Sequence, residues 1–244
     1  MIKIIIHITK FIIATVTALL FASCNFNMNA IEGSGNVTTE KRTVQGDFKN
    51  ISVSNAIDLV IIQSDAKEIT VEADDNLQKE IVTKVENGTL IIKCKYNSFR
   101  NITAKKVTVK MPIIDKVDAS SASSVHTEGL IEGEDITLES SSAASMDVTI
   151  ESDKISLDTG SGASINIKGK ALNLNTSASS GGSINAEKLL ANDVDAQASS
   201  GGTITVNSIV NLKAKASSGG NINYLGSPKI VEKEASSGGN INKS

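Results

Sequence analysis

The sequence predicts an all-β protein, most of which is a parallel β-solenoid. A motif whose cleanest copies read Ser-Ser-Gly-Gly-x-Ile-Asn occurs seven times in the C-terminal half, at spacings of 18 to 21 residues. A fixed period near 20 residues is typical of a solenoid, in which each repeat forms one coil. Apolar and polar residues alternate around each copy, which is the period of a half-buried strand. The chain has 2 Pro in 244 residues and is rich in Thr, Val, Ile, Ser, Gly and Asn, a composition that favours strands and turns.

Residues 1–24 are predicted to be a signal peptide of the lipoprotein type. A basic start is followed by an apolar stretch, Phe11–Ala22, which is too short for a membrane-spanning helix and suits a signal peptide. The stretch ends in Leu20-Phe21-Ala22-Ser23-Cys24. Small residues before a Cys resemble a lipobox, although Phe21 replaces the usual aliphatic residue. Cys24 would then anchor the protein to a membrane through acyl chains. An ordinary signal peptide cleaved near Ala30 is the alternative.

Residues 25–34 are predicted to be a flexible tether between this anchor and the folded part. The residues directly after Cys24 contain no acidic export run. We therefore expect an outer-membrane lipoprotein of a Gram-negative bacterium that faces the periplasm, with display on the cell surface as the alternative.

Residues 35–118 are predicted to be a β-rich region that caps the solenoid, because an open solenoid end presents unpaired strand edges. Asn87-Gly88 is a hairpin signal, and Lys95–Lys106 is expected to be an exposed polar excursion. The expected strands are Val37–Val44, Lys49–Val53, Ile57–Gln63, Glu68–Ala73, Ile81–Glu86, Thr89–Lys95 and Val107–Met111.

Cys94 is the one Cys that follows Cys24, so no disulfide is expected within the mature chain. It alternates with Leu90 and Ile92 on one side of an expected strand. A buried thiol is favoured over a reactive one, because no His or basic helix end is placed to activate it.

Residues 119–244 are predicted to be the solenoid itself, with about seven coils of 19–20 residues. Each coil would contain a strand, a Gly-Gly corner and a shorter strand, because Gly reaches positive φ without steric strain. Stacking at about 4.8 Å per coil would make a rod of about 34 Å. The apolar residues expected to stack in its core are Val125, Met146, Ile165, Ile184, Ile204, Ile222 and Ile241.

A polar row follows the core row by one residue and is expected to point outward. It consists of His126, Asp147, Asn166, Asn185, Thr205, Asn223 and Asn242. Stacked Asn side chains can form hydrogen bonds along parallel strands, which would give them a structural role, and ligand contact is the alternative. The candidate binding face consists of Asn166, Asn185, Asn223 and Asn242.

The repeat resembles the head GIN domain family of auto-transporter adhesins. The signature lies in Gly181–Asn185, Gly219–Asn223 and Gly238–Asn242. The stretches Val53–Val60 and Val117–Val125 also resemble that family, so the likeness covers roughly residues 35–244. The resemblance implies a right-handed parallel β-helix on a secreted or surface-anchored bacterial protein, and it supplies no catalytic residues.

Composition argues against several function classes. The net charge is −3, and Arg42 and Arg100 are the two Arg residues, so no basic patch for nucleic acid is expected. Aromatic residues make up 3% of the chain, which leaves few anchors for sugars or protein partners. His126 is the one His outside the signal peptide, and the turns lack the Asp of calcium-binding β-rolls. No metal, cofactor or catalytic triad is therefore expected.

The sequence favours a non-enzymatic cell-envelope lipoprotein that acts as an adhesin-like or scaffold binding module. Expected partners are the membrane through Cys24, a glycan or envelope protein, and a second copy through the last coil if no other segment covers that end. The alternative is a polysaccharide lyase or hydrolase on a β-helix, because paired carboxylates can perform acid–base catalysis. The acids considered for that role are Glu139, Asp147, Glu151 and Asp158.

Overall fold

A computed structural model describes residues 10–13, 15 and 30–244. Cys24 and residues 25–29 lie outside the described residues. Within the described part of the chain, no helix is long and apolar enough to cross a membrane.

The folded part, residues 30–244, is built of strands, as the sequence predicts. The strands are β1 (Ala30–Glu32), β2 (Val37–Arg42), β3 (Asn50–Val53), β4 (Asp58–Gln63), β5 (Glu68–Asp74), β6 (Ile81–Glu86), β7 (Thr89–Cys94), β8 (Ser98–Arg100), β9 (Lys105–Met111), β10 (Lys116–Ala119), β11 (Ser124–Thr127), β12 (Ile131–Ser140), β13 (Ser145–Thr159), β14 (Ser164–Ala178), β15 (Ser183–Ala198), β16 (Thr203–Ala216), β17 (Asn221–Gly226), β18 (Ile230–Ala235) and β19 (Asn240–Lys243).

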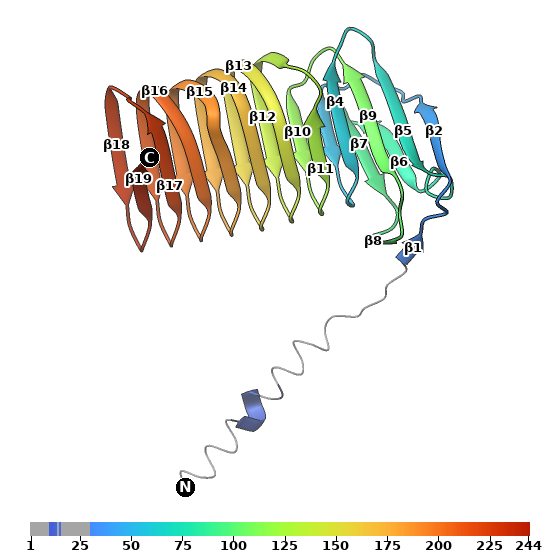
Figure 1. The fold of residues 1–244 in the computed structure, drawn as a ribbon, viewed down its shortest axis with the longest axis horizontal. Coiled ribbons are helices and arrows are strands. Elements are labelled where there is room, and N and C mark those ends of the chain that lie inside the picture. Colours follow the sequence, from blue (N-terminus) through green and yellow to red (C-terminus); the bar gives the residue numbers. More distant parts are fainter. Residues whose placement is uncertain (1–9, 14, 16–29) are drawn as a thin grey trace.

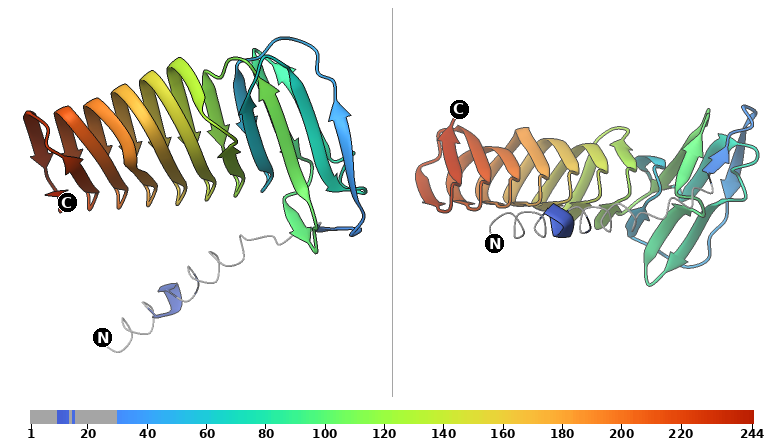
Figure 2. Two further views of the ribbon diagram at one scale, coloured as in Figure 1. Left: turned by 45° about the horizontal axis from the view of Figure 1, so that its top comes forward. Right: turned by 90° about the horizontal axis from the view of Figure 1, so that it is seen from below.

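The C-terminal part is a β-solenoid of about seven coils, which confirms the predicted fold (Figure 1). Each of the long strands β13 to β16 runs around a bent corner, and a tight turn joins it to the next strand. Neighbouring coils pair in parallel, with register shifts after Asn166, after Ala186 and after Ala191. The tight turns line up along one edge of the rod, and the bent corners line up along the opposite edge (Figures 1 and 2).

The predicted core row is in register through the whole stack. Met146 pairs with both Val125 and Ile165, and the same register continues to Ile241. The members from Val125 to Ile222 are at most 1% exposed, whereas Ile241 in the last coil is partly exposed. Parallel stacking therefore places each apolar side chain between two equivalent ones, and the core becomes a continuous column.

The tight turns differ in detail from the prediction that Gly-Gly forms the corner. The two residues with positive φ are the second Ser and the first Gly, for example Ser180 (φ 49°) and Gly181 (φ 73°). The amide of Gly182 donates to the carbonyl of Ser179 (2.8 Å) and closes a type I′ turn. A Cβ on Gly182 would lie 2.7 Å from the carbonyl oxygen of Thr159 in the preceding coil. The first Gly thus adopts the positive φ that the turn requires, and the second, which has no side chain, allows the backbones of neighbouring coils to approach closely.

The stack begins one coil before residues 119–244, where the sequence predicts the solenoid. β10 pairs in parallel with β3, and β11 pairs in parallel with β4. The turn between β3 and β4 contains Asn55 and Ala56, both with positive φ, like the turns of the repeats. Residues 50–63 therefore form a coil of the same kind, and the following strands, up to β9, are inserted between it and the next coil.

This insertion forms the predicted cap at the N-terminal end. β7 continues one side of the stack by pairing with β3, and β9 continues the other side by pairing with β4. Antiparallel strands β6, β5 and β2 then cover them. The predicted hairpin at Asn87-Gly88 is confirmed, since it joins β6 to β7 and both of its residues have positive φ.

Part of the expected tether and of the expected polar excursion is folded. Ala30–Glu32 form β1, which pairs in parallel with β8. The segment Lys95–Lys106 is therefore not simply an exposed excursion, because it contributes β8 and packs Tyr96 and Phe99 against the core. β1 lies at the capped end, on the side of the rod where the tight turns align (Figure 1).

In the described chain, no strand covers the last coil of the solenoid. All six residues of β18 are exposed, and no other segment of the described chain pairs with the outer edge of β18 or β19. Lys233 occupies a core position in this last coil, opposite Ala214. Its ammonium lies 4.5 Å from the ring centre of Tyr224, so one charged side chain lies across the end of the core.

Candidate functional site

Two flat polar faces of the solenoid are candidate contact surfaces. We call the side that follows each tight turn the post-turn face, which contains the row from His126 to Asn242. The side that precedes each tight turn is the pre-turn face, which contains two outward columns. The first column is Lys116, Thr137, Ser156, Asn175, Asp195, Lys213 and Glu232, and the second is Asp118, Glu139, Asp158, Ser177, Gln197, Lys215 and Glu234.

The post-turn row stacks as predicted. Asp147 pairs with Asn166, Asn166 with Asn185, and the register continues through Thr205 to Asn223 and Asn242. Within residues 30–244, however, no side-chain hydrogen bond joins two of these amides. The Oδ1 atom of Asn185 instead accepts from the backbone amide of Glu187 (3.2 Å). The prediction of an amide hydrogen-bond ladder is therefore wrong, and these side chains are available to solvent.

Three carboxylates stand in adjacent coils on the pre-turn face. Asp118 is in register with Glu139, and Glu139 with Asp158. Burial raises the pKa of the Asp118 carboxyl above its ordinary value, and the charge of Glu139 raises it further, whereas Lys116 and Ser52 lower it. The ammonium of Lys116 lies 2.6 Å from Glu139.

The structure brings together only part of the acid set considered from the sequence. Glu139 and Asp158 are neighbours on the pre-turn face. Asp147 lies on the post-turn face, in register with Asn166. Glu151 lies near the bent corner, where it forms an ion pair with Lys170 (3.3 Å). Sequence reasoning missed Asp118, although its place one repeat before Glu139 could have indicated it.

Two adjoining depressions run along the pre-turn face. The first has a volume of about 350 Å³ and is lined by Thr137, Glu139, Ser156, Leu157, Asp158, Asn175, Thr176, Ser177, Asp195 and Gln197. The second has a volume of about 370 Å³ and is lined by Ser177, Gln197, Ala198, Ser199, Lys215, Ala216, Ser217, Glu234 and Ser236. Both are lined by Ser177 and Gln197, so they adjoin, and we call the two together the pre-turn groove.

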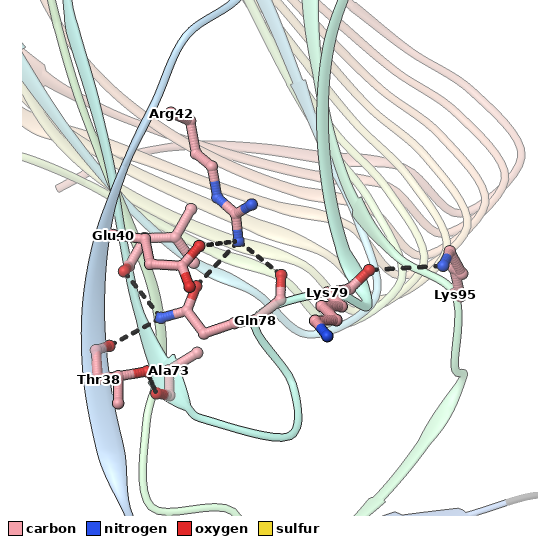
Figure 3. Close-up of polar contacts among 8 residues, drawn as sticks. Thr38, Glu40, Arg42, Ala73, Gln78, Lys79 and Lys95 are labelled. Atoms are coloured by element: carbon pink, nitrogen blue, oxygen red, sulfur yellow. Dashed lines mark hydrogen bonds and ion pairs between the residues drawn. The ribbon is translucent and has the colours of Figure 1, made fainter.

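A polar cluster in the cap fastens its outermost strand (Figure 3). The Nη2 atom of Arg42 donates to the backbone oxygen (2.6 Å) and the Oε1 atom (2.9 Å) of Gln78, and it lies 3.2 Å from Glu40. The Nε2 atom of Gln78 donates to the backbone oxygen of Thr38 (2.8 Å). These bonds join β2 to the turn that follows β5, so the cluster has a structural role.

A buried carboxylate fixes the point where the chain enters the fold. Asp74 is 0% exposed and accepts hydrogen bonds from the backbone amides of Gly35 (3.0 Å), Thr103 (3.1 Å) and Ala104 (2.9 Å). A Cβ on Gly33 would lie 2.3 Å from the Oδ2 atom of Asp74, so only Gly fits there. These contacts hold β1 and β8 at the capped end.

The groups able to perform redox or metal chemistry are few and dispersed. Cys94 is 4% exposed in β7, which confirms the predicted buried strand thiol. Lys105, which the sequence did not single out, lies 3.3 Å from the ring centre of Phe99, and burial lowers its pKa. The Nε2 atom of His126 lies 3.0 Å from the hydroxyl of Ser124. Among the residues that the structure describes, no three His, Cys, Asp or Glu side chains are grouped as metal ligands.

The sequence of residues 47–228 matches the family described as "Putative auto-transporter adhesin, head GIN domain". The chain belongs to this family. The matched residues include the early coil of β3 and β4, the inserted strands β5 to β9 and the repeats as far as β17. The resemblance drawn from the Gly-Gly-x-Ile-Asn copies is therefore confirmed.

Solved structures share the fold of this head GIN domain protein. A protein of Bacteroides fragilis, described as a putative adhesin, has a TM-score of 0.81 at 23% identity and covers 88% of this chain and 100% of its own. A Parabacteroides distasonis protein, described as a putative lipid binding protein, has a TM-score of 0.70 at 24% identity, with coverages of 88% and 100%. A putative adhesin of Parabacteroides merdae has a TM-score of 0.69 at 21% identity, with coverages of 88% and 99%. No curated protein matches the chain.

Proposed function

We propose that this head GIN domain protein is a non-enzymatic binding module of the bacterial cell envelope, adhesin-like or scaffold-like in its role. One observation carries the proposal: the solenoid repeats polar surface groups in register, one per coil, on a rigid rod. Such a surface suits repeated weak contacts with a polymer or with an array of envelope molecules, and several anchored copies would add avidity.

The comparisons support this proposal at the level of the family. The family is named for adhesins, and two of the structural relatives are described as adhesins. A third relative is described as a lipid binding protein. None of these descriptions assigns an enzymatic reaction, which favours a binding role for this chain.

The row Asn166, Asn185, Asn223 and Asn242 is one proposed contact surface. These amides stack in register and make no hydrogen bonds with one another in the described chain. Each amide can both donate and accept a hydrogen bond, so the row could bind a glycan or a protein backbone.

The proposed location is the outer membrane, with Cys24 as the lipid anchor. β1 begins at Ala30, so only five residues, 25–29, separate it from Cys24. Such a linker spans at most about 20 Å when it is fully extended. Because β1 lies on the tight-turn side of the rod (Figure 1), the anchor would hold that edge close to the membrane. The periplasmic face and the cell surface are both compatible with this geometry.

A second copy could join at the open C-terminal coil. β18 is fully exposed and its outer edge is unpaired in the described chain. Lys233 points into the core position at this end, and inward-pointing charges are a device that blocks strand addition. We therefore expect Lys233→Leu to increase association, measured by sedimentation of the purified protein, and unchanged sedimentation would contradict association through this end.

An enzyme remains the second candidate because of Asp118, Glu139 and Asp158. Side chains in register on adjacent coils are about 4.8 Å apart at the backbone, close to the roughly 5–5.5 Å that separates the two carboxyl groups of retaining glycosidases. Against catalysis, Glu139 forms an ion pair with Lys116 at 2.6 Å, which occupies one member of the set.

The deciding experiment measures binding and turnover together. The purified protein is applied to arrays of glycans and envelope proteins, and the same preparations are assayed for release of sugar products. Binding without product release supports the proposal. Product release that is lost in Asp158→Asn would establish the enzyme instead, and failure to bind any arrayed molecule would contradict the binding role.

A further inference from the structure

The pre-turn groove has the length and direction of a site for a linear polymer. Its lining residues come from six successive coils, from Thr137 to Glu234. At about 4.8 Å per coil, the groove extends roughly 24 Å along the rod. The coils are in register, so a chain lying along this axis would meet equivalent backbone positions at regular steps.

The side chains in the groove suit a ligand that is rich in hydroxyl groups. Asn175 and Gln197 each offer a donor and an acceptor, and Ser156 and Ser177 offer hydroxyls. Carboxylates on its border can accept from sugar hydroxyls in charge-assisted hydrogen bonds. Ser177, which is short, and Gln197 line both depressions.

The charge of the groove selects against acidic polymers. Its lining includes one lysine, Lys215, and four carboxylates, which are Glu139, Asp158, Asp195 and Glu234. Three of these carboxylates are ion-paired, Glu234 with Lys215 (2.9 Å), Asp195 with Lys213 (3.8 Å) and Glu139 with Lys116 (2.6 Å), so the unpaired charge of the lining is that of Asp158. A polymer of uronic acids would find no unpaired lysine in the lining and would meet the negative charge of Asp158, which disfavours its binding.

We propose that the pre-turn groove binds an extended polysaccharide of uncharged sugars, lying along the rod axis. In such a polysaccharide the sugar repeat is close in length to the rise of one coil, so successive sugars meet successive coils. The inference rests on the proposed binding function and adds the site and the ligand class. No aromatic residue lines the groove, so a short oligosaccharide binds weakly and affinity rises with chain length until the groove is filled.

The test uses the purified full-length protein and β-1,4-linked gluco-, manno- and xylo-oligosaccharides, with oligogalacturonate as the acidic probe, in calorimetric titrations. The groove variant is Asn175→Ala with Gln197→Ala, and a second variant, Ser177→Arg, blocks the junction. The matched control is Asn173→Ala with Asn192→Ala, which removes two amides that lie outside both the groove lining and the Asn row. A further variant, Asn166→Ala with Asn185→Ala, tests the post-turn face. Thermal melting verifies that each variant is folded.

We expect at least one neutral oligosaccharide to bind, with affinity that increases with its length. Both groove variants should weaken binding roughly tenfold or more, as expected for two lost hydrogen bonds, and the control should bind like the wild-type protein. If Ser177→Arg fails to fold, the double amide variant still decides the question.

Two results would overturn the groove while leaving the binding function intact. One is loss of binding in the Asn166→Ala, Asn185→Ala variant but not in the groove variants, which would place the site on the post-turn face. The other is binding to oligogalacturonate or to an envelope protein but to no neutral oligosaccharide. Absence of binding to every glycan and envelope protein tested would instead remove the proposed function itself.

Discussion

The stacked core predicts that one substitution has different effects at two places in the same column. Ile184 is 1% exposed and lies between Ile165 and Ile204. Ile241 occupies the same column in the last coil, pairs only with Ile222 there and is partly exposed. We therefore compare Ile184→Ala with Ile241→Ala, which remove the same atoms.

The expected magnitudes follow from burial. Ile→Ala removes three carbon groups, worth about 0.8 kcal/mol each when fully buried, and leaves a cavity in a site enclosed on both sides. We expect Ile184→Ala to lower the free energy of unfolding by about 3–4 kcal/mol. At Ile241 the missing coil leaves half of the contacts unmade and no enclosed cavity forms, so the loss should be about 1 kcal/mol.

Urea titrations followed by circular dichroism measure both values, with Asn185→Ala as an outward control that should cost about 0.5 kcal/mol or less. Equal losses at Ile184 and Ile241 would refute the reasoning, because they would mean that the last coil is enclosed like the interior ones. A loss at Asn185 as large as that at Ile184 would show that the inward and outward positions are exchanged.

Three further predictions concern the turns, the acidic column and the anchor. Gly202→Ala places a methyl carbon 2.3 Å from the carbonyl oxygen of Ala178 and should lower the free energy of unfolding by about 2–3 kcal/mol. Gly201→Ala, at φ +74° in open space, should lower it by only about 1 kcal/mol. The reverse order in urea titrations would contradict the turn assignment. Asp118 has a raised pKa in the folded state, so its ionisation disfavours that state as pH rises. Asp118→Asn should therefore raise the urea midpoint at pH 7 but leave it unchanged near pH 3. A stabilisation that persists at pH 3 would rule out the ionisation of Asp118 as its cause. Cys24→Ala should abolish fatty-acid labelling and release the protein into the soluble fraction; labelling that survives would exclude Cys24 as the anchor.

The core of the solenoid could be predicted because its period enforces its packing. Once Val125, Met146 and Ile165 recur at spacings of 21 and 19 residues, parallel stacking must bring them together. The same period also predicts which residues point inward in the strands before and after each turn. What the period could not give was the early coil of β3 and β4, because the cap strands are inserted between that coil and β10, and a period search across an insertion of that length finds no repeat.

The turns show why local chemistry was only partly readable. Both Gly residues of each copy are compatible with positive φ, so sequence alone does not say which of them uses it. The earlier coils hold the clue, since Ala122 and Ala143 occupy the position of the first Gly, with φ of 59° and 62°. Hydrogen bonds between successive turns, such as that from Gly181 to the carbonyl of Ser200 (3.2 Å), hold this conformation whichever residue is present.

The two candidate faces differ in how much their outward residues vary from coil to coil. On the post-turn face nearly every coil repeats a small polar residue, and this regularity made the Asn row conspicuous in the sequence. On the pre-turn face the equivalent column changes from Ser156 to Asn175, Asp195 and Lys213, although the backbone register is the same. The Asn row presents the same amide at most coils, which suits repeated equivalent contacts, whereas the pre-turn column presents hydroxyl, amide and charged groups in turn. The common backbone register spaces both sets at one coil, so a linear polymer along the rod meets a uniform surface on one face and a chemically varied one on the other, and the paired variants of the two faces distinguish them.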